Sequence, residues 1–244
     1  KYRVTGRSIV LNLGNTSIHS SYDVGTLGKP PVLQPCKSSI LQNVTLLSAD
    51  IILIMQVVDR RNIGGVILRK EWESAQDLFG DTLKGIPLWR SPQTSLGEFS
   101  FNPLHVASQH QSTSVLDSSS NSNNNSSSST SSQDHESNNN DQQVHFDIQV
   151  NLWFASEGAC CGIHNQHDFI EYHTQVLGLG RMQKFSKATF DSLYQEIYLA
   201  EGCTHDVFCT TKKRDDWYSY EYPWHQYYSQ SDCVWLATEF HLLS

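Results

Sequence analysis

The sequence predicts an all-β fold with little helix, and three observations support this prediction. Most apolar residues fall in short segments that are rich in β-branched and aromatic side chains and are bounded by Gly, Pro, Asn, Asp or Ser. In residues 144–154 apolar and polar side chains alternate, which is the period of a half-buried strand. A single stretch, 70–83, has a helical pattern, and Gly80 is placed to end it.

The expected strands follow one another along the chain. They occupy residues 8–13, 43–58, 64–72, 144–154, 169–185, 194–200 and 232–243. Each is short, and turn-forming residues separate it from the next.

A low-complexity insert, residues 117–143, interrupts this pattern. It contains 11 Ser and 7 Asn, and no aliphatic residue, Phe, Tyr or Trp. A segment with nothing apolar to bury cannot offset its ordering entropy, so we expect it to be disordered. Strand-like segments flank it, which indicates an expanded loop inside a β architecture. An interdomain linker is the alternative.

Deleting residues 117–143 is therefore expected to leave the melting temperature nearly unchanged, because the closure cost of a flexible loop grows only slowly with its length. Thermal denaturation of the full-length and deleted chains measures this. A large drop would show that the insert is structured.

Charge and targeting features exclude several classes of partner. The chain has 17 Lys and Arg against 25 Asp and Glu, and a net charge of -8. No basic stripe is available for a phosphate backbone, so nucleic acid is not expected as a partner. No apolar run approaches the ~20 residues of a membrane span, and the first residues lack a secretory pattern. The six cysteines show no CxxC spacing. Together these features favour a cytoplasmic protein without a membrane partner.

Histidines and one carboxylate form a spaced pattern in the last hundred residues. Gly158, His164, Glu171 and Gly178 are separated by five, six and six residues, and Gly202 lies three positions before His205. This spacing resembles the two motifs of the cupin superfamily, G-x5-H-x-H-x(3 or 4)-E-x6-G and G-x5-P-x-G-x2-H-x3-N. Gln166 stands where the first motif usually has its second His. Tyr194, Ala200 and Cys209 replace the usual Gly, Pro and Asn of the second.

The resemblance implies a cupin-type double-stranded β-helix, or jelly-roll, barrel over residues 144–244. Residues 1–116 carry no such motif. They would add N-terminal strands to the barrel or form a degenerate second cupin half.

Residue chemistry supports a metal site in such a barrel. Alternate residues of neighbouring strands point inward, so ligands from several strands can converge on one cation. His164, Glu171 and His205 supply the two imidazoles and one carboxylate of a facial triad. Gln166 could add a neutral oxygen, and His167 competes with it, since a one-residue slip would turn it inward. The expected cofactor is a divalent transition metal: Fe, Mn, Zn or Ni.

Three further residues are candidates for catalysis. His173 and Gln175 share a strand face with Glu171, and His225 follows Pro223 at an expected barrel mouth. They could position a substrate or move a proton. We expect a metal-dependent cupin enzyme acting on a small organic molecule, with dioxygenase chemistry slightly favoured over sugar isomerisation or epimerisation. The alternative is a non-catalytic cupin that binds a ligand or a partner. A homodimer is compatible with either function.

Overall fold

The computed structural model describes residues 1–22, 30–56, 71–80, 84–101, 143–213 and 218–243. Apart from Gln143, the Ser- and Asn-rich insert lies outside these ranges. So does the strand expected at 64–72, except for Glu71 and Trp72. The prediction of a mainly β fold is confirmed, because strands make up nearly all of the regular structure in the described ranges.

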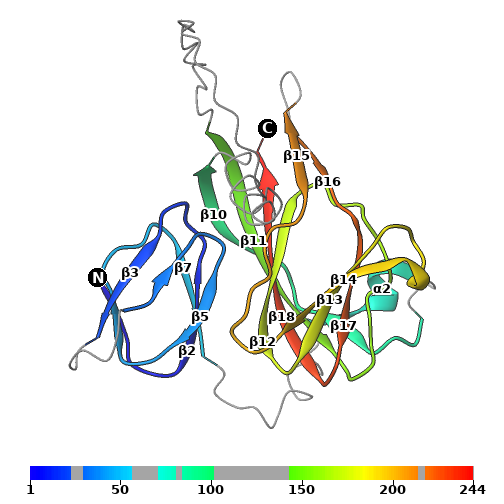
Figure 1. Cartoon of the computed structure of the whole chain (residues 1–244), viewed down its shortest axis with the longest axis horizontal. Helices are drawn as coiled ribbons and strands as arrows, with labels where there is room; N and C mark the ends of the chain where they lie inside the picture. Colours follow the sequence, from blue (N-terminus) through cyan, green and yellow to red (C-terminus); the bar gives the residue numbers. More distant parts are fainter. Residues whose placement is uncertain (23–29, 57–70, 81–83, 102–142, 214–217, 244) are drawn as a thin grey trace, which may run out of the picture.

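The N-terminal strands form a small antiparallel sandwich (Figure 1, blue). They are β1 (Tyr2–Val4), β2 (Ser8–Asn12), β3 (Ile18–Tyr22), β4 (Val32–Leu33), β5 (Ser38–Leu41), β6 (Val44–Leu46) and β7 (Ile52–Met55). One sheet has the order β1-β6-β3-β4 and the other β5-β2-β7. Val10, Ile18 and Leu46 belong to the buried cluster of this sandwich. The single strand expected at 43–58 is thus two strands in different sheets, separated by the polar turn around Asp50.

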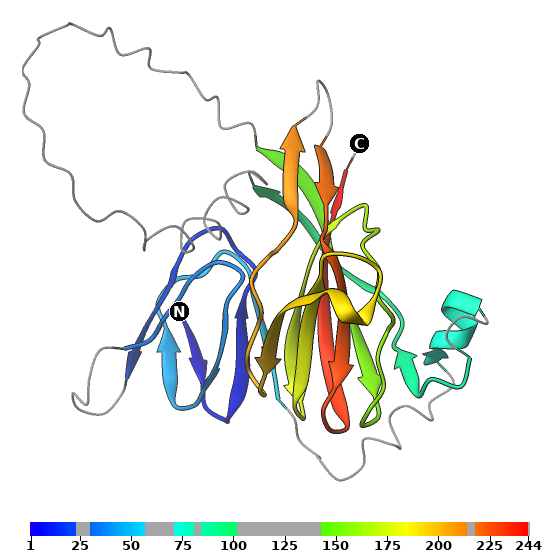
Figure 2. The same ribbon diagram turned by 45° about the vertical axis from the view of Figure 1, so that its right-hand side comes forward.

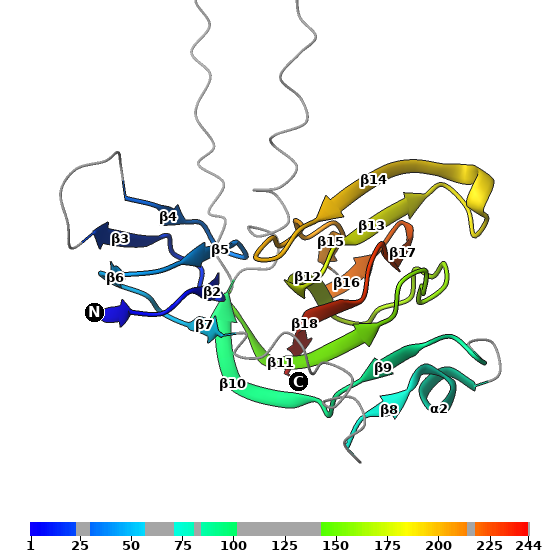
Figure 3. The ribbon, with the colours of Figure 1, turned by 90° about the horizontal axis from the view of Figure 1, so that it is seen from below.

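The remaining strands build a barrel (Figure 3). They are β8 (Glu73–Ser74), β9 (Leu88–Arg90), β10 (Thr94–Phe101), β11 (Val144–Ala155), β12 (Ile170–Leu177), β13 (Gly180–Phe185), β14 (Leu193–Leu199), β15 (Thr210–Lys213), β16 (Tyr218–Glu221), β17 (Trp224–Ser229) and β18 (Cys233–Leu242). The larger sheet runs β12-β18-β11-β9-β8, and β10 also pairs with β11. The β14-β13-β17 sheet lies opposite β9 and β11 (Figure 3). A separate hairpin joins β15 to β16.

Helix is confined to short pieces in the described ranges. The helix expected at 70–83 is only α2 (Ala75–Phe79), because Ser74 caps it: its Oγ accepts from the Asp77 backbone N–H at 3.2 Å. Glu73 and Ser74 pair instead with β9. The other helical piece is a 3-10 turn, η2 (Phe190–Ser192). No described helix has the length and apolarity to cross a lipid bilayer.

Strand alternation decides which side chains face the barrel interior. In the β12–β18 pairing, Glu171 lies opposite Glu239 and His173 opposite Ala237. Neighbours directly opposite on paired strands share a face of the sheet. Residues 171 and 173 therefore face one side, where a cavity lies, and the even-numbered residues face the other.

The outer face of this sheet packs against the sandwich (Figure 2). Ile9 and Leu11 of β2 share one buried cluster with Ile170 and Tyr172 of β12. The Ser38 hydroxyl also donates to the Gly202 carbonyl at 2.7 Å. Every residue of β2 and of β12 is buried, because each strand is covered on both faces. One face of strand β12 therefore borders the barrel interior, and the other contacts the sandwich.

Candidate metal centre

Three histidines from two adjacent segments meet at one end of the barrel interior. His164 lies in the extended segment before β12, and this segment runs antiparallel to β17. The backbone N–H groups of His164 and His225 donate to each other's carbonyls at 2.9 and 2.8 Å. Together with His167, their ring nitrogens lie within 4.8 Å of one another. This group of three side chains could hold a metal ion.

The separation of two of these nitrogens suits a shared cation. Nε2 of His167 lies 3.2 Å from Nε2 of His225. Two imidazole nitrogens on one ion, each at about 2.0–2.1 Å from it, are roughly 2.9–3.4 Å apart for bond angles near 90–109°. The Nε2 atoms of His167 and His225 thus lie about as far apart as two imidazole nitrogens bound to one ion.

Backbone carbonyls set the orientation of two of the rings. Nδ1 of His164 donates to the Gly162 carbonyl at 2.9 Å, and Nδ1 of His225 donates to the Pro223 carbonyl at 2.8 Å. A ring whose Nδ1 carries the donated proton presents the Nε2 lone pair, and this arrangement is typical of metal-binding histidines. The donor chemistry of the site therefore fits a transition metal.

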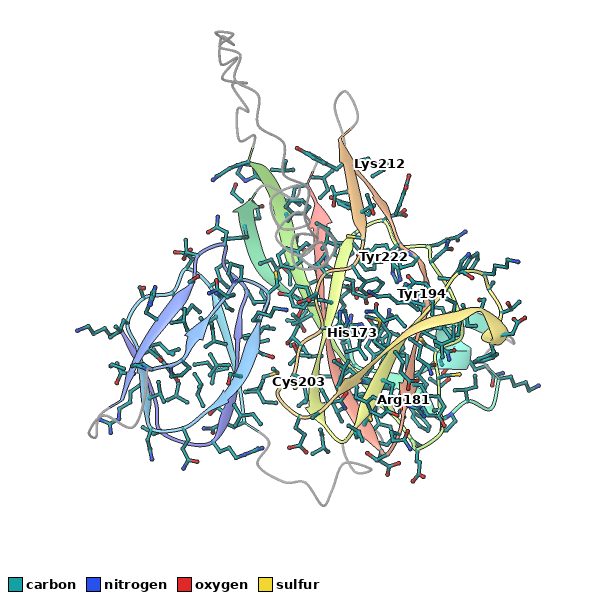
Figure 4. All side chains as sticks on the ribbon, viewed as in Figure 1. His173, Arg181, Tyr194, Cys203, Lys212 and Tyr222 are labelled. Carbon is teal, nitrogen blue, oxygen red and sulfur yellow. The ribbon has the colours of Figure 1, made fainter. Side chains whose placement is uncertain are left out.

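Glu171 adds a carboxylate next to the histidines. Its Oε2 lies 3.8 Å from Nε2 of His167, and its Oε1 accepts from Nε2 of His173 at 3.0 Å. The Tyr222 hydroxyl holds the start of β12, since it accepts from the Glu171 backbone N–H at 2.7 Å and donates to the Phe169 carbonyl at 2.9 Å. Figure 4 labels His173 on β12 and Tyr222 in the connection between β16 and β17.

The electrostatic environment keeps two imidazoles neutral and the carboxylate ionised. Burial, followed by the charge of His164, lowers the pKa of His225 to about 3. Burial also lowers the pKa of His167. Burial alone would raise the pKa of Glu171, but the charge and hydrogen bond of His173 outweigh it, so this pKa is lowered. These are the protonation states that a metal ion needs in its ligands.

His164 differs from the other two rings in its protonation. Burial acts to lower its pKa, but the charge of Cys161 and hydrogen bonds to Cys161 and the Gly162 carbonyl raise the pKa to about 9. A cation that binds through His164 would displace a proton, so metal ions and protons compete for this nitrogen.

His205, expected as a metal ligand, does not join the three-histidine group. Its Nδ1 donates to the Asp206 carbonyl at 2.8 Å. Its Nε2 accepts from the His173 backbone N–H at 2.9 Å and from the Tyr227 hydroxyl at 2.8 Å. Both ring nitrogens form hydrogen bonds within the protein. His205 therefore connects β12 to β17 and has no free lone pair for a metal ion. His225, expected as a catalytic residue, lies in the group instead.

The other expected residues divide between the cavity and the core. His173, Gln166 and His167 line a cavity of about 780 Å³ inside the barrel. The ring of His173 stacks on Tyr227, with centroids 3.9 Å apart. Gln175 is fully buried, its Nε2 donates to the Leu177 carbonyl at 2.6 Å, and it is not part of the cavity wall. Gln175 therefore has a structural role at the end of β12.

Glu239 is one of several cavity residues that sequence reasoning overlooked. Glu239 on β18 is 7% exposed and lines the same cavity. The signal was present in the sequence, because a carboxylate stands in a strand whose other residues are mostly apolar.

Comparison with known proteins shows distant likenesses only. No protein-family model matches the chain, and no curated protein matches it. Among solved structures, an oxalate oxidase in complex with the substrate analogue glycolate is 11% identical, with a TM-score of 0.27 over 39% of this chain and 42% of that one. A cupin domain from Bordetella pertussis is 16% identical, with a TM-score of 0.25 over 38% of this chain and 80% of that one.

A further match comes from the crystal structures of DMSP lyases, at 14% identity and a TM-score of 0.25, over 38% of each chain. This chain thus spans about two fifths of the oxalate oxidase and of the DMSP lyase. The described strands form an antiparallel β-barrel, and the spacing of Gly158, His164, Glu171 and Gly178 resembles the first cupin motif.

Proposed function

We propose that the barrel holds one divalent transition metal, Fe, Mn, Zn or Ni, through His164, His167 and His225, with Glu171 as an additional ligand. The observation that carries the proposal is the convergence of three imidazoles, two of them oriented by backbone carbonyls, beside an ionised carboxylate. Nitrogen and carboxylate donors suit these metals.

The cavity supports an enzymatic role on a small organic molecule. Its volume of about 780 Å³ falls in the range of ligand pockets, roughly 300–1,000 Å³. A bound metal would act there as a Lewis acid or as a redox centre. His173 lines the cavity next to Glu171 and would orient a substrate or hold a proton at its Nδ1. The aromatic rings of Trp153 and Trp235 would exclude water from the bound molecule.

Elemental analysis of protein purified without a metal-affinity tag tests the metal proposal. We expect about one equivalent of a transition metal. We also expect chelation to lower the melting temperature, because a metal that binds only the folded chain stabilises it. Less than about a tenth of an equivalent of any transition metal, before and after incubation with Fe, Mn, Zn or Ni salts, would contradict the proposal.

Within this function we favour oxygenase chemistry over sugar isomerisation, because imidazole and carboxylate ligands together are typical of non-haem Fe(II) oxygenases. Oxygen uptake by the iron-loaded protein with a panel of small metabolites measures this preference. Turnover of a sugar without oxygen uptake would favour an isomerase. Saturable binding without turnover would favour the non-catalytic alternative.

A further inference from the structure

Strand β14 forms an apolar edge on the outside of the barrel. It ends the β14-β13-β17 sheet, and among the described strands it pairs only with β13 (Figure 3). Large apolar side chains in or next to the strand are exposed: Phe190 by 68%, Leu193 by 44%, and Tyr194 and Tyr198 by 58% each. Figure 4 labels Tyr194 on this strand. Exposed apolar surface gathered in this way is typical of a protein–protein contact.

The edge lacks the features that usually prevent a strand from pairing with another chain. Proteins commonly protect such edges with Lys, Pro or a bulge in the middle of the strand. Strand β14 contains no Lys, Arg or Pro. Its residues 195–199 keep an unbroken register with β13, and the irregularity lies at Tyr194, near the start of the strand. Alternate backbone groups of an edge strand point away from the sheet, so residues 195–199 can accept one further strand.

The charges at this edge allow two identical copies to meet. Glu196 is the one charged residue of β14. Its Oε2 lies 3.1 Å from Nη1 of Arg181 on β13, and the same guanidinium lies over the ring of Tyr198, 5.6 Å from the ring centroid. The carboxylate is therefore balanced by a cation of its own chain, and the edge carries no net charge that would repel a second copy.

The order of residues in β14 makes the strand complementary to itself. If two copies pair antiparallel about a two-fold axis at Ile197, Tyr198 of each copy lies opposite Glu196 of the other, and no two like charges are paired. An axis at Glu196 would place two carboxylates directly opposite each other, which is unfavourable. Ile197 is also the middle of the stretch 195–199 that has a regular register.

The exposed apolar surface is large enough for a weak dimer. A large aromatic side chain buries roughly 150–250 Å² when it is fully covered. The exposed parts of the four side chains named above therefore supply roughly 400–500 Å² per copy, or about 800–1,000 Å² in a dimer, and the paired backbone adds to this. Crystal-packing contacts mostly stay below about 800 Å², and specific interfaces begin near about 1,200 Å².

We propose that two copies of this chain dimerise through β14, with the two strands antiparallel about Ile197, so that the β14-β13-β17 sheet continues from one barrel into the other. An interface of this size is expected to have a Kd of about 1–100 μM. The dimer forms on the outside of the barrel and does not require the metal centre proposed above.

Sedimentation equilibrium of the full chain over a wide concentration range tests the proposal. We expect mainly monomer at about 0.1 μM and mainly dimer at about 500 μM. Tyr194→Lys removes an exposed ring and adds a cation at the edge, so it should weaken dimerisation at least about tenfold. Tyr2→Lys is the matched control, because Tyr2 is 54% exposed but lies on the sandwich, and it should leave the dimer unchanged.

A second variant guards against misfolding of Tyr194→Lys. Tyr198→Glu gives the Arg181 guanidinium a carboxylate in place of an aromatic ring, so we expect it to fold. Its new carboxylate would lie opposite Glu196 of the second copy, so the dimer should be lost.

Hydrogen exchange identifies the strand that pairs. Amides of β14 should exchange more slowly at high protein concentration, whereas those of β10, whose register is broken before Gly97, should not change. Monomer at every concentration, a dimer that survives both β14 variants, or unchanged exchange in β14 would overturn the inference.

Discussion

Replacing His225 by alanine is expected to lower the metal affinity of the barrel at least about 100-fold. Loss of a residue that merely supports a metal ligand already costs about 10- to 100-fold, and loss of the ligand itself costs more. His225 is the residue that joins β17 to the histidine group, and its Nε2 lies 3.2 Å from that of His167. The measurement is metal content after dialysis against a dilute chelator, together with competition titration.

His205→Gln is the matched comparison for this experiment. His205 is nearly as buried as His225 and lies in the same barrel, but its Nε2 accepts from the His173 backbone and the Tyr227 hydroxyl, whereas Nε2 of His225 faces Nε2 of His167. We expect it to keep the metal, with some loss of stability. An exposed histidine variant, His145→Ala, controls for general effects of losing an imidazole. If His205→Gln loses the metal and His225→Ala keeps it, the ligands are those that the motif spacing suggests: His164, Glu171 and His205.

Replacing Gly178 by alanine is expected to destabilise the fold severely. Gly178 has a φ of 77°, and a Cβ built on it would lie 2.1 Å from the backbone carbonyl oxygen of Asp232. A side chain in this conformation costs about 1–3 kcal/mol, and overpacking adds about 1–3 kcal/mol more. Because the contact is with backbone, no side-chain rotation relieves it. Denaturant unfolding of the variant measures the loss.

Gly158→Ala separates the two contributions. Gly158 has a similar φ of 81°, but a Cβ there meets nothing within 4 Å. It should therefore show the conformational cost alone, about 1–3 kcal/mol. Equal destabilisation by the two substitutions would show that the approach of Asp232 contributes nothing. Gly158 begins the motif and Gly178 ends it, and the structure gives them different physical reasons to be glycine.

The sequence was sufficient to predict local features of the fold. The alternation in residues 144–154 predicted β11, whose Phe146 and Ile148 are buried as expected. The spacing from Gly158 to Gly178 predicted a β-barrel, and the described strands form one. The helix at 70–83 was predicted too long, because a helical pattern does not reveal that Ser74 pairs with β9 before it caps α2.

The histidine group depends on contacts that sequence spacing does not contain. His164 and His225 are 61 positions apart and meet only because their segments pair as antiparallel strands. His205 matches a motif spacing, but its partners are the His173 backbone and Tyr227, which only the folded chain brings near. The pairing of distant segments therefore determines which histidines meet. Sequence periodicity cannot predict this, because it describes each strand separately.

The double burial of β12 has a consequence for how the molecule unfolds. Its Glu171 and His173 face the cavity, while Ile170 and Tyr172 face β2 of the sandwich. Unfolding of either the barrel or the sandwich would expose apolar surface of the other. The two should therefore unfold in one cooperative transition. Amide hydrogens of β12 should then exchange with solvent only through global unfolding. A core substitution at Leu11, far from the histidines in sequence, would shorten the lifetime of the closed state around them.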